Sequence, residues 1–172
     1  MRRQFQSVAS QTTRLILIDL VRSDLGDEEA AIYRPLLIEA RRTGMLIAHS
    51  YLSDSGPTLC RQPIQGLCPL PDESVFIRSR ESAFSSRQFC DWVEASTGPL
   101  VFAGAANAAI ASAKAAAALG HKVFVSPVAA NTNQERGFRS RLALYPLDCP
   151  VQSTSLPLEH FMRVLDAETA NG

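Results

Sequence analysis

The stretch Arg14–Leu20, with the sequence RLILIDL, decides the fold of this chain. Five of its seven residues are Leu or Ile. Such an apolar run is typical of a strand that is covered on both faces, as in a parallel sheet between two layers of helices. Asp19 interrupts the run, and a buried carboxylate needs a partner. The stretch therefore predicts a central strand with a chemically distinct position at its end.

Outward from this strand, short apolar runs alternate with longer segments of helical pattern. The expected strands are Arg14–Leu20, Met45–His49, Ser74–Arg78, Leu100–Gly104, His121–Ser126 and Pro150–Thr154. The expected helices are Asp27–Thr43, Ser85–Ser96, Asn107–Leu119, 132–144 and Leu158–Leu165. Alternation of this kind predicts a three-layer α/β/α architecture with a Rossmann-like parallel sheet of about six strands.

Composition narrows the class of protein. The chain has 172 residues, of which 46% are hydrophobic, and its 17 basic side chains balance 17 acidic ones. We expect one domain over residues 1–172, with a flexible segment 1–12 and a tail 167–172. Zero net charge argues against nucleic acid and acidic membranes as partners, and no apolar run reaches the ~20 residues of a membrane span. A cytoplasmic location is expected.

Four cysteines, too few for a disulfide scaffold, are expected to be free thiols: Cys60, Cys68, Cys90 and Cys149. Their spacing does not match a structural zinc site, so no metal is expected there. Cys60 and Cys68 flank a loop that could cover a pocket.

The topology directs attention to the residues at the ends of strands. Ligands of open α/β sheets bind outside the carboxyl ends of the strands, which makes Asp19, His49, Arg78 and the segment after Gly104 the candidate positions. Two interpretations of Asp19 stay open. It is either an exposed carboxylate at the sheet edge or a site carboxylate paired with a cation, for which Arg78 is the natural candidate.

Several segments, taken in order, resemble the isochorismatase-like cysteine hydrolases. They are Leu15–Asp19, Ala48–His49, Pro71–Phe84 with its Ser-Ala-Phe element, Leu100–Gly104, and Ser112–Gly120 continuing into Val125. The resemblance implies the fold of that family and hydrolysis of a small amide or a vinyl ether. It further implies an Asp base, a Lys that stabilises charge, a Cys nucleophile at the start of the helix after the fourth strand, and assembly into dimers or tetramers.

Transferred residue by residue, the catalytic pattern is incomplete. Asp19 falls on the base position and Arg78 on the lysine position. The nucleophile position falls on Ala108 when counted back from Gly120, or on Ile110 when counted forward from Gly104. Neither is a cysteine, so we expect cysteine-type hydrolysis to be lost.

The sequence gives little support for a substitute nucleophile or for a metal site. Ser112 should lie one turn deeper in the helix, with its hydroxyl bonded to nearby backbone. Some relatives hold zinc after the second strand, where this chain offers Asp54 but no histidine between Tyr51 and Val75. Neither a metal nor a cofactor is expected.

Three functions remain open at this point. The first is binding of a small anionic molecule, such as a carboxylate, or of an amide, in an Asp19/Arg78 pocket. Its ligand contacts would come from His49, Phe84, Asn107 and Ala109. The second is hydrolysis of amides or esters with a non-standard nucleophile or an activated water. The third is a non-catalytic role in a homo-oligomer.

Overall fold

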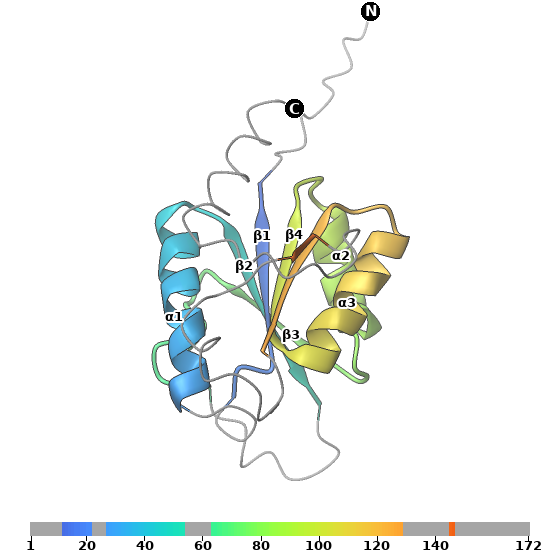
Figure 1. The fold of residues 1–172 in the computed structure, drawn as a ribbon. Coiled ribbons are helices and arrows are strands. Elements are labelled where there is room, and N and C mark those ends of the chain that lie inside the picture. Colours follow the sequence, from blue (N-terminus) through green and yellow to red (C-terminus); the bar gives the residue numbers. More distant parts are fainter. Residues whose placement is uncertain (1–11, 22–26, 54–62, 129–144, 147–172) are drawn as a thin grey trace, which may run out of the picture.

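A computed structural model describes residues 12–21, 27–53, 63–128 and 145–146 (Figure 1). Six strands and three α-helices form the described part of the chain, with one short 3-10 helix, η1. Their bounds are β1 Arg14–Ile18, α1 Asp27–Arg42, β2 Leu46–Leu52, β3 Ser74–Arg78, η1 Ala83–Ser85, α2 Arg87–Glu94, β4 Leu100–Ala105, α3 Ala106–Ala118, β5 Val123–Val128 and β6 Tyr145–Pro146.

The strands form one sheet in the order β3-β2-β1-β4-β5-β6. Strands β1 to β5 run parallel, which confirms the predicted sheet. A further strand, β6, pairs antiparallel with β5. It is not the expected sixth strand Pro150–Thr154, which lies outside the described residues. Strand order reverses at β1, because β2 and β4 lie on its two sides. The carboxyl end of β1 is therefore the switch point where such sheets bind ligands.

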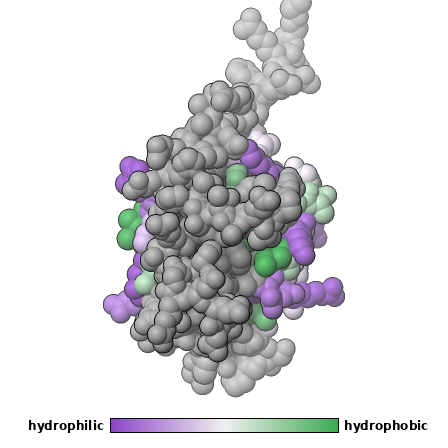
Figure 2. All heavy atoms as spheres, in the orientation of Figure 1, coloured by the Kyte–Doolittle hydropathy of each residue, from purple (hydrophilic) through white to green (hydrophobic). Residues whose placement is uncertain are grey.

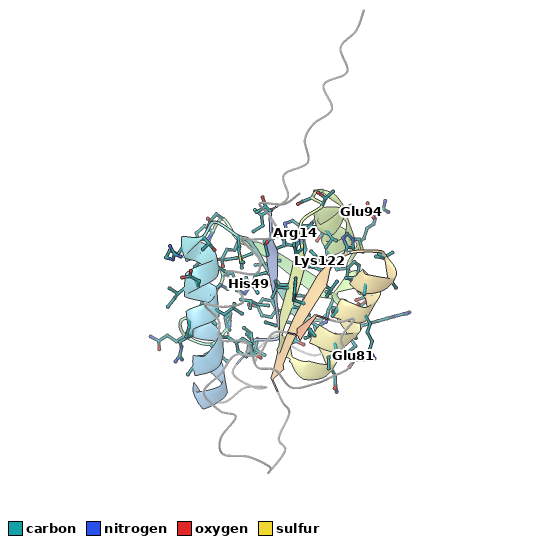
Figure 3. All side chains as sticks on the ribbon, turned by 45° about the horizontal axis from the view of Figure 1, so that its top comes forward. Arg14, His49, Glu81, Glu94 and Lys122 are labelled. Atoms are coloured by element: carbon teal, nitrogen blue, oxygen red, sulfur yellow. The ribbon has the colours of Figure 1, made fainter. Side chains whose placement is uncertain are left out.

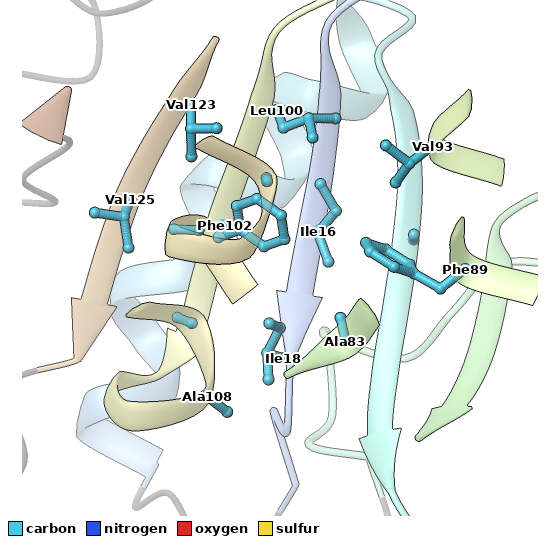
Figure 4. Close-up of a cluster of buried hydrophobic side chains, with 14 of the residues drawn as sticks. Ile16, Ile18, Ala83, Phe89, Val93, Leu100, Phe102, Ala108, Val123 and Val125 are labelled. Carbon is cyan, nitrogen blue, oxygen red and sulfur yellow. The ribbon is translucent and has the colours of Figure 1, made fainter. Parts of the chain in front are cut away.

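Alternation along the strands divides the core into two clusters, one on each face of the sheet. Leu15 and Leu17 of β1 point to the α1 face, where they pack with Leu36 and Leu37. The second cluster lies on the α2 and α3 face, and its larger members include Ile16, Ile18, Phe89 and Phe102 (Figure 4). Because successive strand residues face opposite sides, one continuous apolar run serves both layers.

The exposed surface of the described part of the chain carries both hydrophilic and hydrophobic side chains. On the flanks visible in Figure 2, hydrophilic residues are interspersed with a few hydrophobic ones. Among the described helices, none combines the length and the apolar character that crossing a bilayer requires.

Some sequence predictions need correction and others lie outside the described residues. The second strand, expected to close at His49, continues to Leu52, so His49 lies in mid-strand. The third helix begins at Ala106, one residue earlier than expected. Segments 1–11, 132–144, Pro150–Thr154, Leu158–Leu165 and 167–172 are not among the described residues.

Candidate functional site

The chain leaves β1 through an unusual conformation at Asp19. Its φ is +50°, a left-handed value that Asp tolerates better than most residues. The Asp19 amide donates to Ser50 O at 3.0 Å, and the Asp19 carbonyl accepts from the Val21 amide at 2.9 Å. Strained backbone at a strand end is a common property of functional sites.

The Asp19 carboxylate and the Arg78 guanidinium form a buried ion pair. Arg78 Nη1 donates to Asp19 Oδ1 at 3.0 Å, and Arg78 Nη2 donates to Asp19 Oδ2. Arg78 Nε donates to Glu81 O at 3.0 Å and Nη1 also donates to Ser50 O at 3.2 Å. Only 5% of Asp19 and 2% of Arg78 are exposed. The two-pronged geometry is the one that suits guanidinium and carboxylate best.

This pairing changes what Asp19 can do. The amide of Leu52 donates to Asp19 Oδ1 at 3.0 Å, so one oxygen accepts from both Leu52 and Arg78 while the other accepts from Arg78. A general base must direct a lone pair at the proton that it removes. Here both carboxylate oxygens of Asp19 accept hydrogen bonds from groups of the protein.

The start of α3 lies against the end of β1. Gly104 has φ +121°, and a Cβ added there would lie 2.0 Å from Ile18 O, so only glycine permits this approach. Figure 4 shows Ala108, in the first turn of α3, at the end of the sheet where Ile18 lies. The two candidates for the nucleophile position, Ala108 and Ile110, both belong to or pack against the second cluster.

The first residues of α3 carry no hydroxyl or thiol, and the next one, that of Ser112, is engaged. Residues 105–111 contain none in the sequence. Ser112 is fully buried, donates its hydroxyl to Ala108 O at 2.7 Å and accepts from the Ala83 amide at 2.8 Å. The expectation that this hydroxyl is bonded to backbone is confirmed, and it ties α3 to η1.

The proposed ligand contacts are distributed unevenly. Asn107 is exposed on the first turn of α3. Ala109 is buried in the second cluster, and Phe84 packs against that cluster. The centre of the Phe84 ring lies 5.1 Å from the centre of the Phe89 ring. His49 is on the other face of the sheet, because it contacts residues next to α1.

His49 belongs to a second polar group, which the sequence analysis did not find. His49 Nε2 lies 2.9 Å from Glu73 Oε2, and Arg41 binds Glu73 through Nε at 2.7 Å and Nη2 at 3.0 Å. The Leu70 amide donates to the same carboxylate at 2.9 Å. Figure 3 labels His49 between α1 and the strands of the sheet. The pairing of β2 with β3 brings His49 close to Glu73, and Arg41 reaches Glu73 from α1, so no spacing in the sequence marks this group.

Burial and charge act in opposite directions on this group. Burial lowers the pKa of His49, and its hydrogen bond with Glu73 only partly offsets that effect. Burial would raise the pKa of Glu73, but hydrogen bonds from Arg41, the Leu70 amide and His49 outweigh it and lower the pKa to about 2. Burial and neighbouring negative charge raise the pKa of Tyr51 to about 12. Glu73 is therefore ionised and Tyr51 protonated near neutral pH.

Of the four cysteines, the structure describes two. Cys68 is exposed and its thiol donates to Ile64 O, whereas Cys90 on α2 donates to Phe84 O. Burial raises the pKa of the Cys90 thiol, which disfavours the reactive thiolate. Cys60 and Cys149 lie outside the described residues, as does Asp54. Within the described part of the chain, no three His, Cys, Asp or Glu residues gather as a metal site would require.

Known proteins resemble this chain in structure. An isochorismatase family protein from Desulfovibrio vulgaris is 20% identical with a TM-score of 0.61, over 67% of this chain and 80% of that chain. An isochorismatase from Pseudomonas putida is 20% identical with a TM-score of 0.59, over 94% and 83%. A MAR1 ribonuclease from Caenorhabditis elegans is 15% identical with a TM-score of 0.55, over 69% and 64%.

No family model matches the chain. No curated protein matches it either. The structural relatives carry different activities in their names, so the likeness concerns architecture and not the reaction. By its sheet order, its layers and these neighbours, the chain has the isochorismatase-like fold.

Proposed function

We propose that this chain is a binding protein on an isochorismatase-like fold, without cysteine-type hydrolysis, and that it takes a small anionic molecule beside the start of α3. The observation that argues most directly against hydrolysis is the buried Asp19–Arg78 ion pair at the switch point of the sheet. The pair places an arginine where the resemblance implies a lysine, and this arginine binds both oxygens of the expected base.

The case against hydrolysis rests on two groups. The residues at the start of α3 carry no nucleophile, and the Ser112 hydroxyl is engaged with backbone on both its donor and its acceptor side. Asp19 would have to leave Arg78 before it could accept a proton from water. Leaving Arg78 buried without its partner costs several kcal/mol, on the order of 3 to 5.

The case for an anion rests on the N-terminus of α3. This helix has 13 residues, its N-cap is Ala105 without a side-chain cap, and its first turn has no acidic residue. Its first amides therefore keep their partial positive charge, which favours an anion. The exposed Asn107 adds a side-chain amide donor, and the Asp19–Arg78 pair follows β1, the strand next to β4 in the sheet. A carboxylate is the ligand class that fits best.

Calorimetric titration of small mono- and dicarboxylates and inorganic phosphate into the full chain tests the binding site. Asn107→Asp should weaken binding of the best ligand about fivefold, because it places a negative charge where the anion would lie. The matched control Gln88→Glu makes the same amide-to-acid change on the first turn of α2 and should leave affinity unchanged. Absence of binding across the panel, or equal effects of both variants, would refute the anion site.

Hydrolysis with an activated water is the competing function, and the same preparation tests it. We expect no ammonia release from a panel of small amides and no cleavage of small esters. Turnover by the natural chain that disappears in Asp19→Asn would establish the hydrolase instead.

A further inference from the structure

We propose that the edge strand β3 pairs with β3 of a second copy of this chain, in antiparallel orientation about a two-fold axis at Phe76. The proposal concerns the outer edge of β3, whereas the side chain of Arg78, the last residue of that strand, binds Asp19. It rests on the backbone direction of β3, on its exposed side chains and on the charges at its two ends.

The backbone of β3 presents its outer hydrogen-bonding groups at two residues. Arg78 O accepts from the Ser53 amide of the β2 side at 2.7 Å. In a parallel pair, every second residue directs both its N–H and its C=O to the neighbouring strand. Ser74, Phe76 and Arg78 therefore face β2, while Val75 and Ile77 direct their backbone groups outward. Of the described strands, only β2 pairs with β3.

These two residues match each other under two-fold symmetry. If Phe76 lies opposite Phe76 of the other copy, Val75 lies opposite Ile77 and Ile77 opposite Val75. Each such pair exchanges both N–H and C=O groups, which is the hydrogen-bonded pairing of antiparallel strands. The outward groups of the strand would thus all be satisfied by an identical strand.

The side chains of the same residues are exposed and apolar. Val75 is 48% exposed and Ile77 is 57% exposed, high values for β-branched residues in a strand. Leu70, just before the strand, and Ile38 on α1 are exposed as well. Ile38 is close to the edge because Arg41, one turn along α1, binds Glu73 beside β3. Four of the six large hydrophobic residues with high exposure thus belong to this side of the described chain. Such a grouping marks an interaction surface.

Charge favours an identical copy over another partner. In the proposed register, Asp72, in the turn before the strand, comes near Arg80 of the other copy, in the bend after it, at both ends of the contact. Both residues are exposed. The chain has zero net charge, so two copies do not repel each other at long range. An uncovered edge with apolar side chains is otherwise a site of uncontrolled aggregation, which pairing in a closed dimer prevents.

Sedimentation velocity of the full chain over about 1 to 100 μM measures the association. We expect a dimer for the natural chain and a monomer for Ile77→Lys, because a lysine on an edge strand blocks pairing. Leu119→Lys is the matched control, since Leu119 is 66% exposed at the end of α3 and should leave the dimer intact. A monomeric natural chain overturns the proposal, as does Ile77→Lys that dimerises like the natural chain.

A pair of variants at Val75 separates the backbone from the side chain. Val75→Pro removes the outward N–H without removing a bond to β2, and should dissociate the dimer. Val75→Ala keeps that N–H and should weaken the dimer less. Equal dissociation by both variants would contradict strand pairing. Circular dichroism of each variant shows whether the fold is kept.

A charge swap tests the contact at the two ends of the strand. Asp72→Arg alone should weaken the dimer, and the double variant Asp72→Arg with Arg80→Asp should restore it.

Discussion

Asp19 and Arg78 decide the character of the site at the scale of single residues. Each is buried, and each satisfies the other through two hydrogen bonds. An arginine at this position differs from a lysine, because its planar fork can hold both carboxylate oxygens and keep its charge. The ion pair therefore occupies the carboxylate of the expected base instead of leaving it free to accept a proton.

A double-mutant cycle tests whether the two side chains act as a unit. Arg78→Met should lower the free energy of unfolding by about 3 to 5 kcal/mol, since it leaves a buried carboxylate without its cation. The double variant Asp19→Asn with Arg78→Met should cost clearly less than the sum of the single changes, and Asn tolerates the left-handed backbone at this position. Urea unfolding measures all four proteins. Additivity within about 0.5 kcal/mol would show that the pair is not coupled.

The carboxyl end of α2 shows a comparable device at the scale of an element. Arg14 is fully buried at the start of β1, and its guanidinium donates to the carbonyls of Trp92, Val93, Ser96 and Gly98. It also lies 5.5 Å from the centre of the Trp92 ring. Burial lowers the pKa of Arg14, yet the group remains charged because arginine starts so high. In Figure 3 it lies at the end of the sheet opposite Glu81, away from the candidate site.

Removing this cap should destabilise the fold without touching the site. Arg14→Met should lower the free energy of unfolding by about 3 kcal/mol, because carbonyls at the end of α2 lose their donor and their complementary charge. The exposed Arg87→Met at the other end of α2 should change it by less than about 0.5 kcal/mol. Thermal and urea unfolding measure both. Similar losses in the two variants would refute the capping role.

Gly104 sets how closely β4 and α3 approach β1. Gly104→Ala should be severely destabilising, by more than about 3 kcal/mol, because its φ of +121° and the Ile18 carbonyl both exclude a Cβ. Gly120→Ala is the matched comparison, since Gly120 also has a positive φ but nothing within 4 Å of an added Cβ. Its cost should be about 1 kcal/mol. Soluble yield and unfolding temperature would show the difference, and equal effects would contradict the close approach.

The stability of the whole molecule should depend on pH through the His49–Glu73 group. The pKa of His49 and that of Glu73 are both lower in the folded chain than their ordinary values, so the unfolded chain binds protons more readily. The free energy of unfolding should therefore fall as the pH falls below about 6.5, and fall further between about 4.5 and 2 as Glu73 takes up a proton. The second step should amount to no more than about 3 kcal/mol.

His49→Gln separates the first step from the second. The variant should be less stable at pH 7 but should lose less stability between pH 7 and 5, since it has no imidazole to protonate. His121→Gln provides the comparison. Burial also lowers the pKa of His121, but His121 is less buried than His49. Urea unfolding at several pH values measures the slopes. An unchanged slope in His49→Gln would refute the assignment.

Much of the architecture followed from the sequence alone, because hydrophobic period and turn residues are local. The continuous apolar run of β1, the glycine after α1 and the alanine-rich α3 predicted the parallel sheet and its helices. The strand ends were less certain. Local pattern did not show that β2 continues past His49 to Leu52, since that length depends on pairing with β1 and β3.

The sequence by itself determined that the start of α3 has no cysteine and that Asp19 and Arg78 lie at the ends of two predicted strands, because these are facts of order and residue type. Tertiary structure alone decided that the two charges bind each other, that His49 turns toward Glu73 and Arg41, and that Val75 and Ile77 are exposed on the edge strand of the described sheet. The physical reason is that ion pairing, burial and strand neighbours are set by distances between segments far apart in the chain. Such distances exist only once the sheet has formed.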